Sequence, residues 1–211
     1  MKILRYTLIL SILASGSFCK KSAEEILSEA EKNPQNIERL DLGMKKLGKI
    51  PDSLHRFKNL KWLDVRMNGL NSLPESIDSW SQLEYLNIYG NEITSLPDNI
   101  KNLKNLKVFF GGNNKFPAIP ETLKELPQLE ALYLDQNKIS LTESDIENVL
   151  GMQKLEILDL SRNFDLKSFP KNIDQLADHP RLRLLILKGS GLKGSEVKKA
   201  KDSLSKIRIE F

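Results

Sequence analysis

Aromatic, charged and amide side chains recur at steps of 23 residues through the middle of this 211-residue chain. The set consists of Trp62, Tyr85, Tyr89, Phe110, Tyr133, Arg66, Asp64 and Asn87. Trp, Tyr and Arg dominate binding at protein interfaces, where truncating a hot-spot residue costs about 2 kcal/mol or more. These residues therefore indicate partner recognition. Aromatic residues also favour strands, where they pack on one another across the sheet, and this alternative requires no partner.

Two aspartates, Asp41 and Asp64, also lie 23 residues apart. Adjacent carboxylates on neighbouring strands repel each other. A divalent cation held by both of them, with Asn87 next in line, would relieve the repulsion because calcium prefers oxygen ligands. Arg39 and Arg66 are close enough in sequence to neutralise the pair instead. We favour the arginines and predict no metal site.

Histidine and cysteine are scarce in this chain. His55 and His179 fall in different segments, so they do not form a zinc-binding set, and Cys19 is the single cysteine. The net charge is +4, with lysines dispersed along the chain, which argues against a nucleic-acid partner. We predict no catalytic residue and no cofactor.

A repeated pattern of aliphatic residues must position the recognition residues. Seven segments begin with an aliphatic residue followed by another, usually aliphatic, three and five positions later. The segments begin at Ile37, Leu60, Leu83, Leu106, Leu129, Leu155 and Leu182. Their separations are 23, 23, 23, 23, 26 and 27 residues. This alternation predicts a short strand in each segment, with the aliphatic residues inside and the recognition residues on the opposite face.

An asparagine follows most of these strands, eight positions after the start of the segment. The asparagines are Asn68, Asn91, Asn114, Asn137 and Asn163. A buried amide in a turn can bond the backbone of the neighbouring coil, as buried polar groups must. We assign these asparagines a structural role and no part in binding.

Departures from the pattern predict the remaining elements. A capping box at Ser22 and Glu25 predicts a helix that covers the first repeat. Thr142 begins a predicted helix in the fifth segment, and Gly111 replaces an aliphatic core residue that Phe109 or Phe116 would compensate for. The stretch from residue 195 to residue 211 predicts a helix followed by a short strand.

The N-terminus has the composition of an export signal. Residues 1–6 carry two cations, and residues 7–14 are mainly apolar, too short a run to span a bilayer. We predict a signal peptide over residues 1–18 and lipidation of Cys19. The large Phe18 departs from the usual lipidation motif, which has a small residue there, so an ordinary secretory signal with an incidental cysteine is the alternative.

The repeated unit resembles the 23-residue bacterial leucine-rich repeat. With its signal and cap helix, the chain is similar to the secreted leucine-rich-repeat proteins of Leptospira-type spirochaetes. The resemblance implies an α/β solenoid: a right-handed coil with a concave parallel sheet of about seven strands and a convex side of mixed 3-10 and α-helix. We expect a lipidated N-terminus and helical cap over residues 19–36, repeats over 37–194 and a C-terminal cap over 195–211.

This resemblance also implies a non-enzymatic, monomeric protein of the bacterial cell envelope or surface, either an outer-membrane lipoprotein or a secreted protein, that interacts with the host. The expected partner is a host or matrix protein bound through the concave aromatic face, with a membrane contact through lipid on Cys19. A structural or self-associating envelope component and a glycan-binding module are the alternatives.

Overall fold

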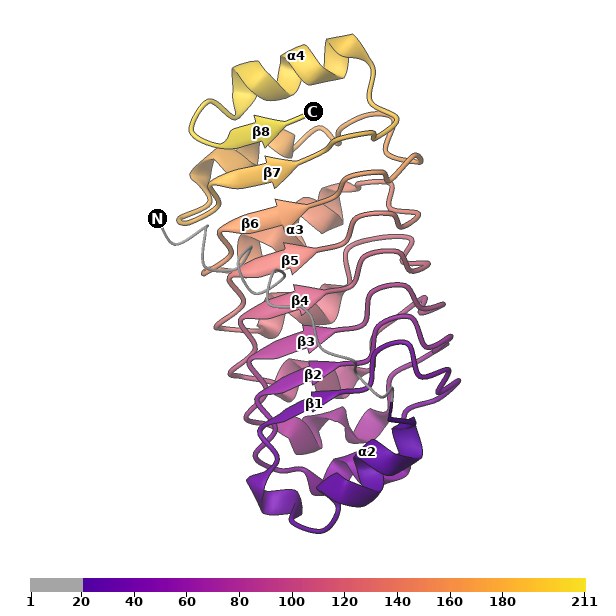
Figure 1. Cartoon of the computed structure of the whole chain (residues 1–211). Coiled ribbons are helices and arrows are strands. Elements are labelled where there is room, and N and C mark those ends of the chain that lie inside the picture. The colour runs from indigo at the N-terminus through magenta and orange to yellow at the C-terminus, as the bar shows by residue number, and fades with distance from the viewer. Residues whose placement is uncertain (1–20) are drawn as a thin grey trace, which may run out of the picture.

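The computed structural model describes residues 21–211, which form a curved stack of coils with one sheet along one face (Figure 1). Eight parallel strands follow one another in sequence order across the sheet. They are β1 Arg39–Asp41, β2 Trp62–Asp64, β3 Tyr85–Asn87, β4 Val108–Phe110, β5 Ala131–Tyr133, β6 Ile157–Asp159, β7 Leu184–Ile186 and β8 Arg208–Glu210. The first seven strands come from the seven repeated segments, and the predicted terminal strand adds the eighth.

Short helices on the convex side return the chain to the next strand. They are the 3-10 helices η3 Asp52–Arg56, η4 Glu75–Trp80, η5 Asp98–Asn102, η6 Glu121–Glu125 and η7 Ile173–Asp178, and the α-helix α3 Glu143–Gly151. A proline precedes each of η3 to η6, and its fixed φ suits the first turn. Thr142 and Asp145 form a capping box at the start of α3. The predicted mixture of 3-10 and α-helix is confirmed.

One continuous apolar core fills the space between the sheet and the convex helices. Within each strand segment the aliphatic positions point inward, and Leu60, Leu63 and Val65 are 0% exposed. Fully burying an aliphatic side chain of this kind contributes roughly 1.5–3 kcal/mol. Because each coil packs only on its neighbours, this burial is distributed evenly along the stack.

The core is covered at both ends. At the N-terminal end α2, Ala23–Ala30, has the predicted capping box between Ser22 and Glu25, and a short 3-10 helix, η2 Pro34–Asn36, leads into β1. At the other end α4, Gly194–Ser203, lies over the last coil (Figure 1). The predicted signal peptide and Cys19 lie outside the described residues. Within residues 21–211, none of the helices has the length and apolar character needed to cross a bilayer.

The asparagine side chains join each coil to the one before it. The amide of Asn91 donates to the carbonyls of Val65 and Ile88 at 3.2 and 2.7 Å. Its Oδ1 accepts from the backbone N–H groups of Asn68 and Leu70, both at 3.0 Å. Asn68, Asn114, Asn137 and Asn163 form bonds of the same kind, and all five residues are at most 8% exposed.

Gly111 leaves room for an aromatic ring in the core. A Cβ atom at this position would lie 2.6 Å from Cε1 of Phe109 and 3.0 Å from Cδ2 of Leu134. Phe109 therefore occupies the space that an aliphatic side chain fills in the other coils, as the sequence suggested. Phe116 is buried elsewhere in the core.

We expect Gly111→Ala to lower the free energy of unfolding by about 1–3 kcal/mol, because the added methyl group overpacks a filled core. Urea denaturation followed by circular dichroism measures this change. Gly194→Ala is the matched control, since a Cβ at Gly194 meets no atom within 4 Å. A Gly111→Ala protein as stable as Gly194→Ala would contradict the packing argument.

His179 fastens the end of α3 to the start of β7. The imidazole is 7% exposed. Its Nδ1 accepts from the backbone N–H of Leu182 at 2.8 Å, and its Nε2 lies 3.1 Å from the carbonyl of Met152. With Nδ1 as the acceptor, Nε2 carries the proton and donates, so the ring is neutral. Burial lowers the pKa of His179 below its ordinary value of 6.5.

We expect acidification to destabilise the fold through His179. A lowered folded-state pKa means that the unfolded chain takes up a proton more readily, so this contribution is complete above pH 6.5 and is lost as the pH falls below it. The free energy of unfolding, measured between about pH 7 and about pH 5, should fall more for the wild type than for His179→Gln. Asn99→Ala, which removes a non-titrating side chain at an exposed site, should retain the wild-type pH dependence. Parallel pH profiles for the wild type and His179→Gln would contradict the assignment.

Candidate functional site

Four aromatic rings form a continuous ladder across the concave face. Trp62 stacks on Tyr85 with ring centroids 4.9 Å apart. Tyr85 meets Phe110 at 5.4 Å, and Phe110 stacks on Tyr133 at 4.4 Å with an interplanar angle of 2°. The guanidinium of Arg39 lies 3.3 Å from the centroid of the Trp62 ring and extends the ladder to β1. We call these five residues the aromatic ladder.

Strand register explains the course of the aromatic ladder. Trp62 is paired with Tyr85 on β2 and β3, and Phe110 with Tyr133 on β4 and β5. Between β3 and β4 the ladder shifts by two positions, because Tyr85 is paired with Val108 rather than with Phe110. Neighbouring parallel strands lie about 4.8 Å apart, so paired rings meet at stacking distance.

An apolar layer lies beside the rings on the same face of the sheet. Val108, Ala131, Ile157 and Leu184 are 1–9% exposed, and Tyr85, Phe110, Tyr133 and Ile186 pack against them. Strand alternation predicts that all these positions lie on the exposed concave face, but the four aliphatic residues are buried there. The rings pack across strands, and they also remain partly exposed. Packing and recognition are thus compatible on this face.

Asp64 and Asn87 are buried, which corrects their expected exposure. Asp64 is 0% and Asn87 7% exposed. Asp64 forms an ion pair with Arg66 and accepts from Nδ2 of Asn87 at 3.1 Å and from the backbone N–H of Arg66 at 3.0 Å. Burial raises the pKa of Asp64 above its ordinary value although Arg66 opposes the shift, and the neighbouring Asp41 adds to it. Asp64 holds the partly exposed Arg66 in place, and Asn87 in turn holds Asp64.

Arg39 and Arg66 were both expected to neutralise the aspartate pair, but only Arg66 contacts one of its carboxylates. Asp41 and Asp64 are paired in the β1–β2 register, as expected from their spacing. Arg66 neutralises Asp64, whereas Arg39 stacks on Trp62. In the part of the chain that the structure describes, no group of three or more His, Cys, Asp or Glu residues is arranged to hold a metal ion.

A hydrogen-bonded group beside the ladder involves residues that sequence reasoning missed. Nε2 of Gln136 donates to Oη of Tyr89 at 2.9 Å and to Oδ2 of Asp135 at 3.0 Å. A Cβ atom at Gly112 would collide with the Asp135 carboxylate and lie 3.0 Å from Cδ2 of Tyr89. The absence of a side chain at Gly112 therefore allows Asp135 to reach across towards Tyr89. Gln136 follows the strand in a left-handed conformation, φ 54°, and its spacing offered no signal.

The electrostatics of the face keep Tyr85 and Tyr133 as neutral hydroxyls. Burial and the charge of Asp64 raise the pKa of Tyr85 to about 12, and burial and Asp159 raise the pKa of Tyr133. Asp159 has a raised pKa because of burial, with Asp135 contributing. Asp159 occupies the same repeat position as Asp41 and Asp64, so the repeat pattern could have identified it as a residue of this face. The face offers aromatic surface flanked by hydroxyls and carboxylates.

Comparison with known proteins identifies the family. The family profile of the leucine-rich repeat region matches residues 75–209. The chain belongs to the leucine-rich repeat family. Membership supports a protein-binding module and a non-enzymatic fold. No curated protein matches the sequence.

Two solved leucine-rich-repeat structures share the fold. A leucine-rich-repeat protein of Leptospira interrogans superposes with a TM-score of 0.57 at 23% identity, over 87% of this chain and 56% of its own. An internalin of Listeria monocytogenes gives a TM-score of 0.54 at 21% identity, over 84% of this chain and 62% of its own. This chain thus spans less than two thirds of either protein. The predicted solenoid, and its resemblance to Leptospira leucine-rich-repeat proteins, are confirmed.

Proposed function

We propose that this leucine-rich-repeat protein is an exported, non-enzymatic lipoprotein that binds a partner protein through its concave face. The observation that supports this most strongly is the aromatic ladder, whose stacked rings remain partly exposed on a sheet. Rings already ordered by stacking lose little conformational freedom when a partner covers them. A purely solvated sheet would have no need of aromatic side chains at these positions.

The contact surface in this proposal consists of the aromatic ladder, Tyr89 and Arg66. Asp64 and Asn87 act beneath it, because they are buried and hold Arg66. Asp135 and Gln136 join the surface through Tyr89. A complementary partner would present apolar or aromatic side chains to the rings and a basic group near Asp135 and Asp159.

The binding proposal is tested by photo-crosslinking in the native cell. An aromatic photoreactive residue at position 89 keeps a ring at the proposed contact, and the same residue in place of the exposed Asp78 on η4 serves as the convex control. We expect a discrete protein adduct from position 89 that is absent from position 78. Adducts only to copies of this chain would instead indicate self-association, and binding to a glycan array without any protein adduct would indicate a glycan-binding module.

The proposed anchor rests on the sequence of the N-terminus and needs its own test. We propose that residues 1–18 direct export, that Cys19 is lipidated, and that the protein is held at the cell envelope as a monomer. Metabolic labelling with a fatty-acid analogue should label the wild type and not Cys19→Ser. Equal labelling of the two, or label in neither, would overturn the lipid anchor and leave a secreted protein.

A further inference from the structure

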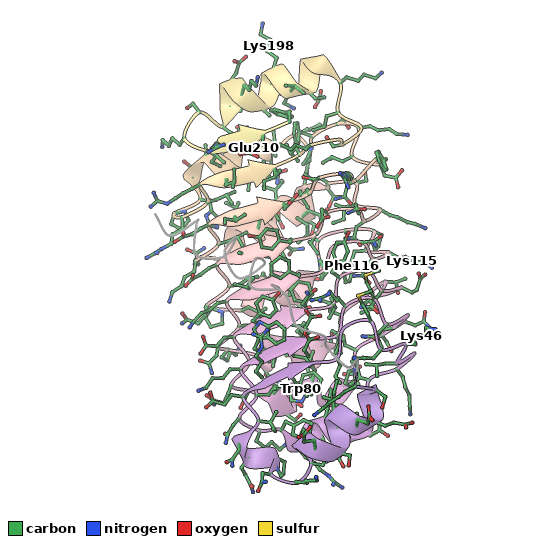
Figure 2. The ribbon with its side chains drawn as sticks, in the orientation of Figure 1. Lys46, Trp80, Lys115, Phe116, Lys198 and Glu210 are labelled. Carbon is green, nitrogen blue, oxygen red and sulfur yellow. The ribbon has the colours of Figure 1, made fainter. Side chains whose placement is uncertain are left out.

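A groove on the convex side is formed where the type of return helix changes. It has a volume of about 420 Å³, a size typical of ligand pockets. The 3-10 helices η4, η5 and η6 pack in succession, and α3 then packs against η6. The groove lies between the first turns of α3 and the segments that lead into η5 and η6. Figure 2 shows Phe116, one of its lining residues, on the side of the turns that follow the strands.

The groove contains polar groups without protein partners. Asn148 of α3 lines it and is only 5% exposed, yet its side chain forms no hydrogen bond within the described residues. Oγ1 of Thr122, also in the lining, is buried and has no partner there. An unpaired buried polar group costs about 1–3 kcal/mol. The Thr122 hydroxyl carries this cost, whereas the polar atoms of Asn148 have no partner among residues 21–211 and reach the open groove. A ligand in the groove would pair with both groups.

By contrast, one carboxylate of the lining, that of Asp145, is fully used within the fold. Oδ1 of Asp145 accepts from the backbone N–H of Ile119 at 2.7 Å. Its Oδ2 accepts from the backbone N–H and the hydroxyl of Thr142 at 2.8 and 2.6 Å. Asp145 therefore fixes the wall of the groove, while Asn148 and Thr122 are the largely buried polar groups of the lining that have no partner in the described part of the protein.

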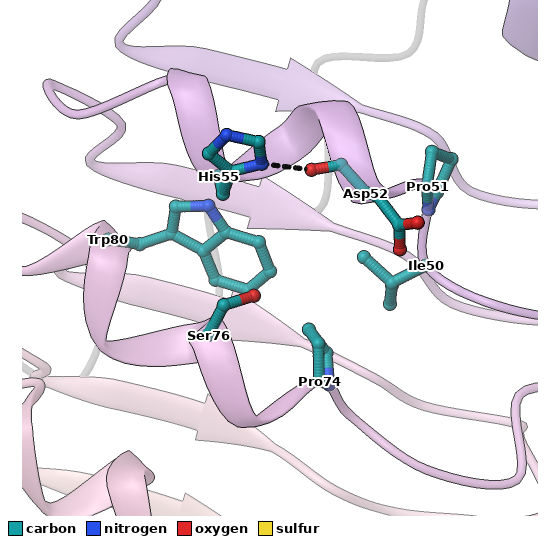
Figure 3. Close-up of a pocket in the computed structure, with 7 residues that line it drawn as sticks. All are labelled: Ile50, Pro51, Asp52, His55, Pro74, Ser76 and Trp80. Atoms are coloured by element: carbon teal, nitrogen blue, oxygen red, sulfur yellow. Dashed lines mark hydrogen bonds between the residues drawn. The ribbon is translucent and has the colours of Figure 1, made fainter.

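A smaller cavity elsewhere on the convex side serves as a comparison for the groove. It has a volume of about 140 Å³ and lies between η3 and η4 (Figure 3). Nε1 of Trp80 donates to the carbonyl of Leu54 at 2.8 Å, and Nδ1 of His55 pairs with the carbonyl of Asp52. These two ring nitrogens are thus paired within the fold itself.

We propose that the groove binds a short extended peptide segment, with the Asn148 carboxamide paired to one peptide group and Thr122 to a second polar atom. A carboxamide offers one acceptor and two donors, and a peptide group has the complementary N–H and C=O. The carboxylates of Asp98 and Glu121 also line the groove, and no lysine or arginine does, which disfavours anions. Pro117 and Ala118 supply apolar surface for a small side chain.

The probe for this proposal is the blocked dipeptide N-acetyl-alanyl-alanine methylamide, titrated into the full ¹⁵N-labelled protein. We expect shifts of the Asn148 side-chain amide signals, identified by their absence from Asn148→Leu, and at least tenfold weaker binding by Asn148→Leu and by Thr122→Val. Because both substitutions remove an unpaired polar group, their thermal midpoints should equal or exceed that of the wild type. Ser76→Ala, in the smaller cavity, is the control and should bind as the wild type does.

Three results would overturn the proposal: no shifts in the groove up to the solubility limit of the probe, equal binding by the wild type and Thr122→Val, or the same shifts with methyl α-glucoside. If Asn148→Leu does not fold, Thr122→Val still decides, since valine has the shape of threonine without its hydroxyl. A loss of thermal stability in Thr122→Val would show that the hydroxyl serves the fold, which also contradicts a ligand role.

Discussion

Asn91→Ala should lower the free energy of unfolding by about 3 kcal/mol or more, a large part of the 5–15 kcal/mol typical of a folded domain. The substitution leaves the backbone N–H groups of Asn68 and Leu70 without a partner. It also removes one of the two asparagine bonds that the carbonyls of Val65 and Ile88 each accept. All four groups are buried, so water does not replace the lost bonds. Urea denaturation gives the change in free energy.

Asn99→Ala is the matched control for this experiment. Its amide donates a single bond, to the carbonyl of Glu75 at 2.8 Å, at an exposed site. We expect a change within about 0.5 kcal/mol there, as for most surface substitutions. If Asn91→Ala and Asn99→Ala destabilise the protein equally, the asparagines do not join the coils as described.

Tyr89→Ala should weaken binding of the partner captured at position 89 by about 2 kcal/mol, or roughly thirtyfold. Tyr89 is partly exposed and lies outside the apolar layer formed by Val108, Ala131, Ile157 and Leu184. Its removal therefore takes away contact surface and the bond from Gln136, and leaves the stacked rings intact. Isothermal titration with the purified partner measures the loss.

Two further variants test the contribution of the Tyr89 hydroxyl and the location of the contact surface. Tyr89→Phe keeps the ring and loses the bond from Gln136, so we expect an intermediate loss of affinity. Asp78→Ala on the convex side should bind as the wild type does. Unchanged affinity in Tyr89→Ala would contradict the concave contact, and an equal loss in Asp78→Ala would point to a different surface.

The regular part of the fold was predictable because a period of 23 residues fixes both strand and register. Trp62 and Tyr85, one period apart, are paired in the sheet, as are Asp41 and Asp64. The side-chain geometry was less accessible. Alternation alone cannot show that Asp64 is 0% exposed or that Arg39 contacts the Trp62 ring and not an aspartate. Both features depend on the packing of neighbouring strands.

The irregular coils limited prediction of the sites more than of the fold. The sequence around Thr142, which forms a capping box in the structure, predicted the start of α3. The groove beside it follows from packing an α-helix next to a 3-10 helix, which no local pattern encodes. Likewise, the reach of Asp135 across Gly112 depends on two strands at once. Gln136 is a candidate binding residue because of its hydrogen bonds to Tyr89 and Asp135, and Asn148 because its side chain has no hydrogen-bond partner within the described residues. Neither feature can be read from the sequence.

The asparagine bonds also have a consequence for how the molecule opens. Because each amide ties its own coil to the one before it, a coil cannot separate without breaking bonds in its neighbour, and unfolding should be cooperative along the stack. Ser190 stands where the last repeat would have its asparagine. That coil lacks the amide coupling, so fraying should begin there, and amide hydrogen exchange should be fastest around β7 and β8 and slowest around β3 and β4.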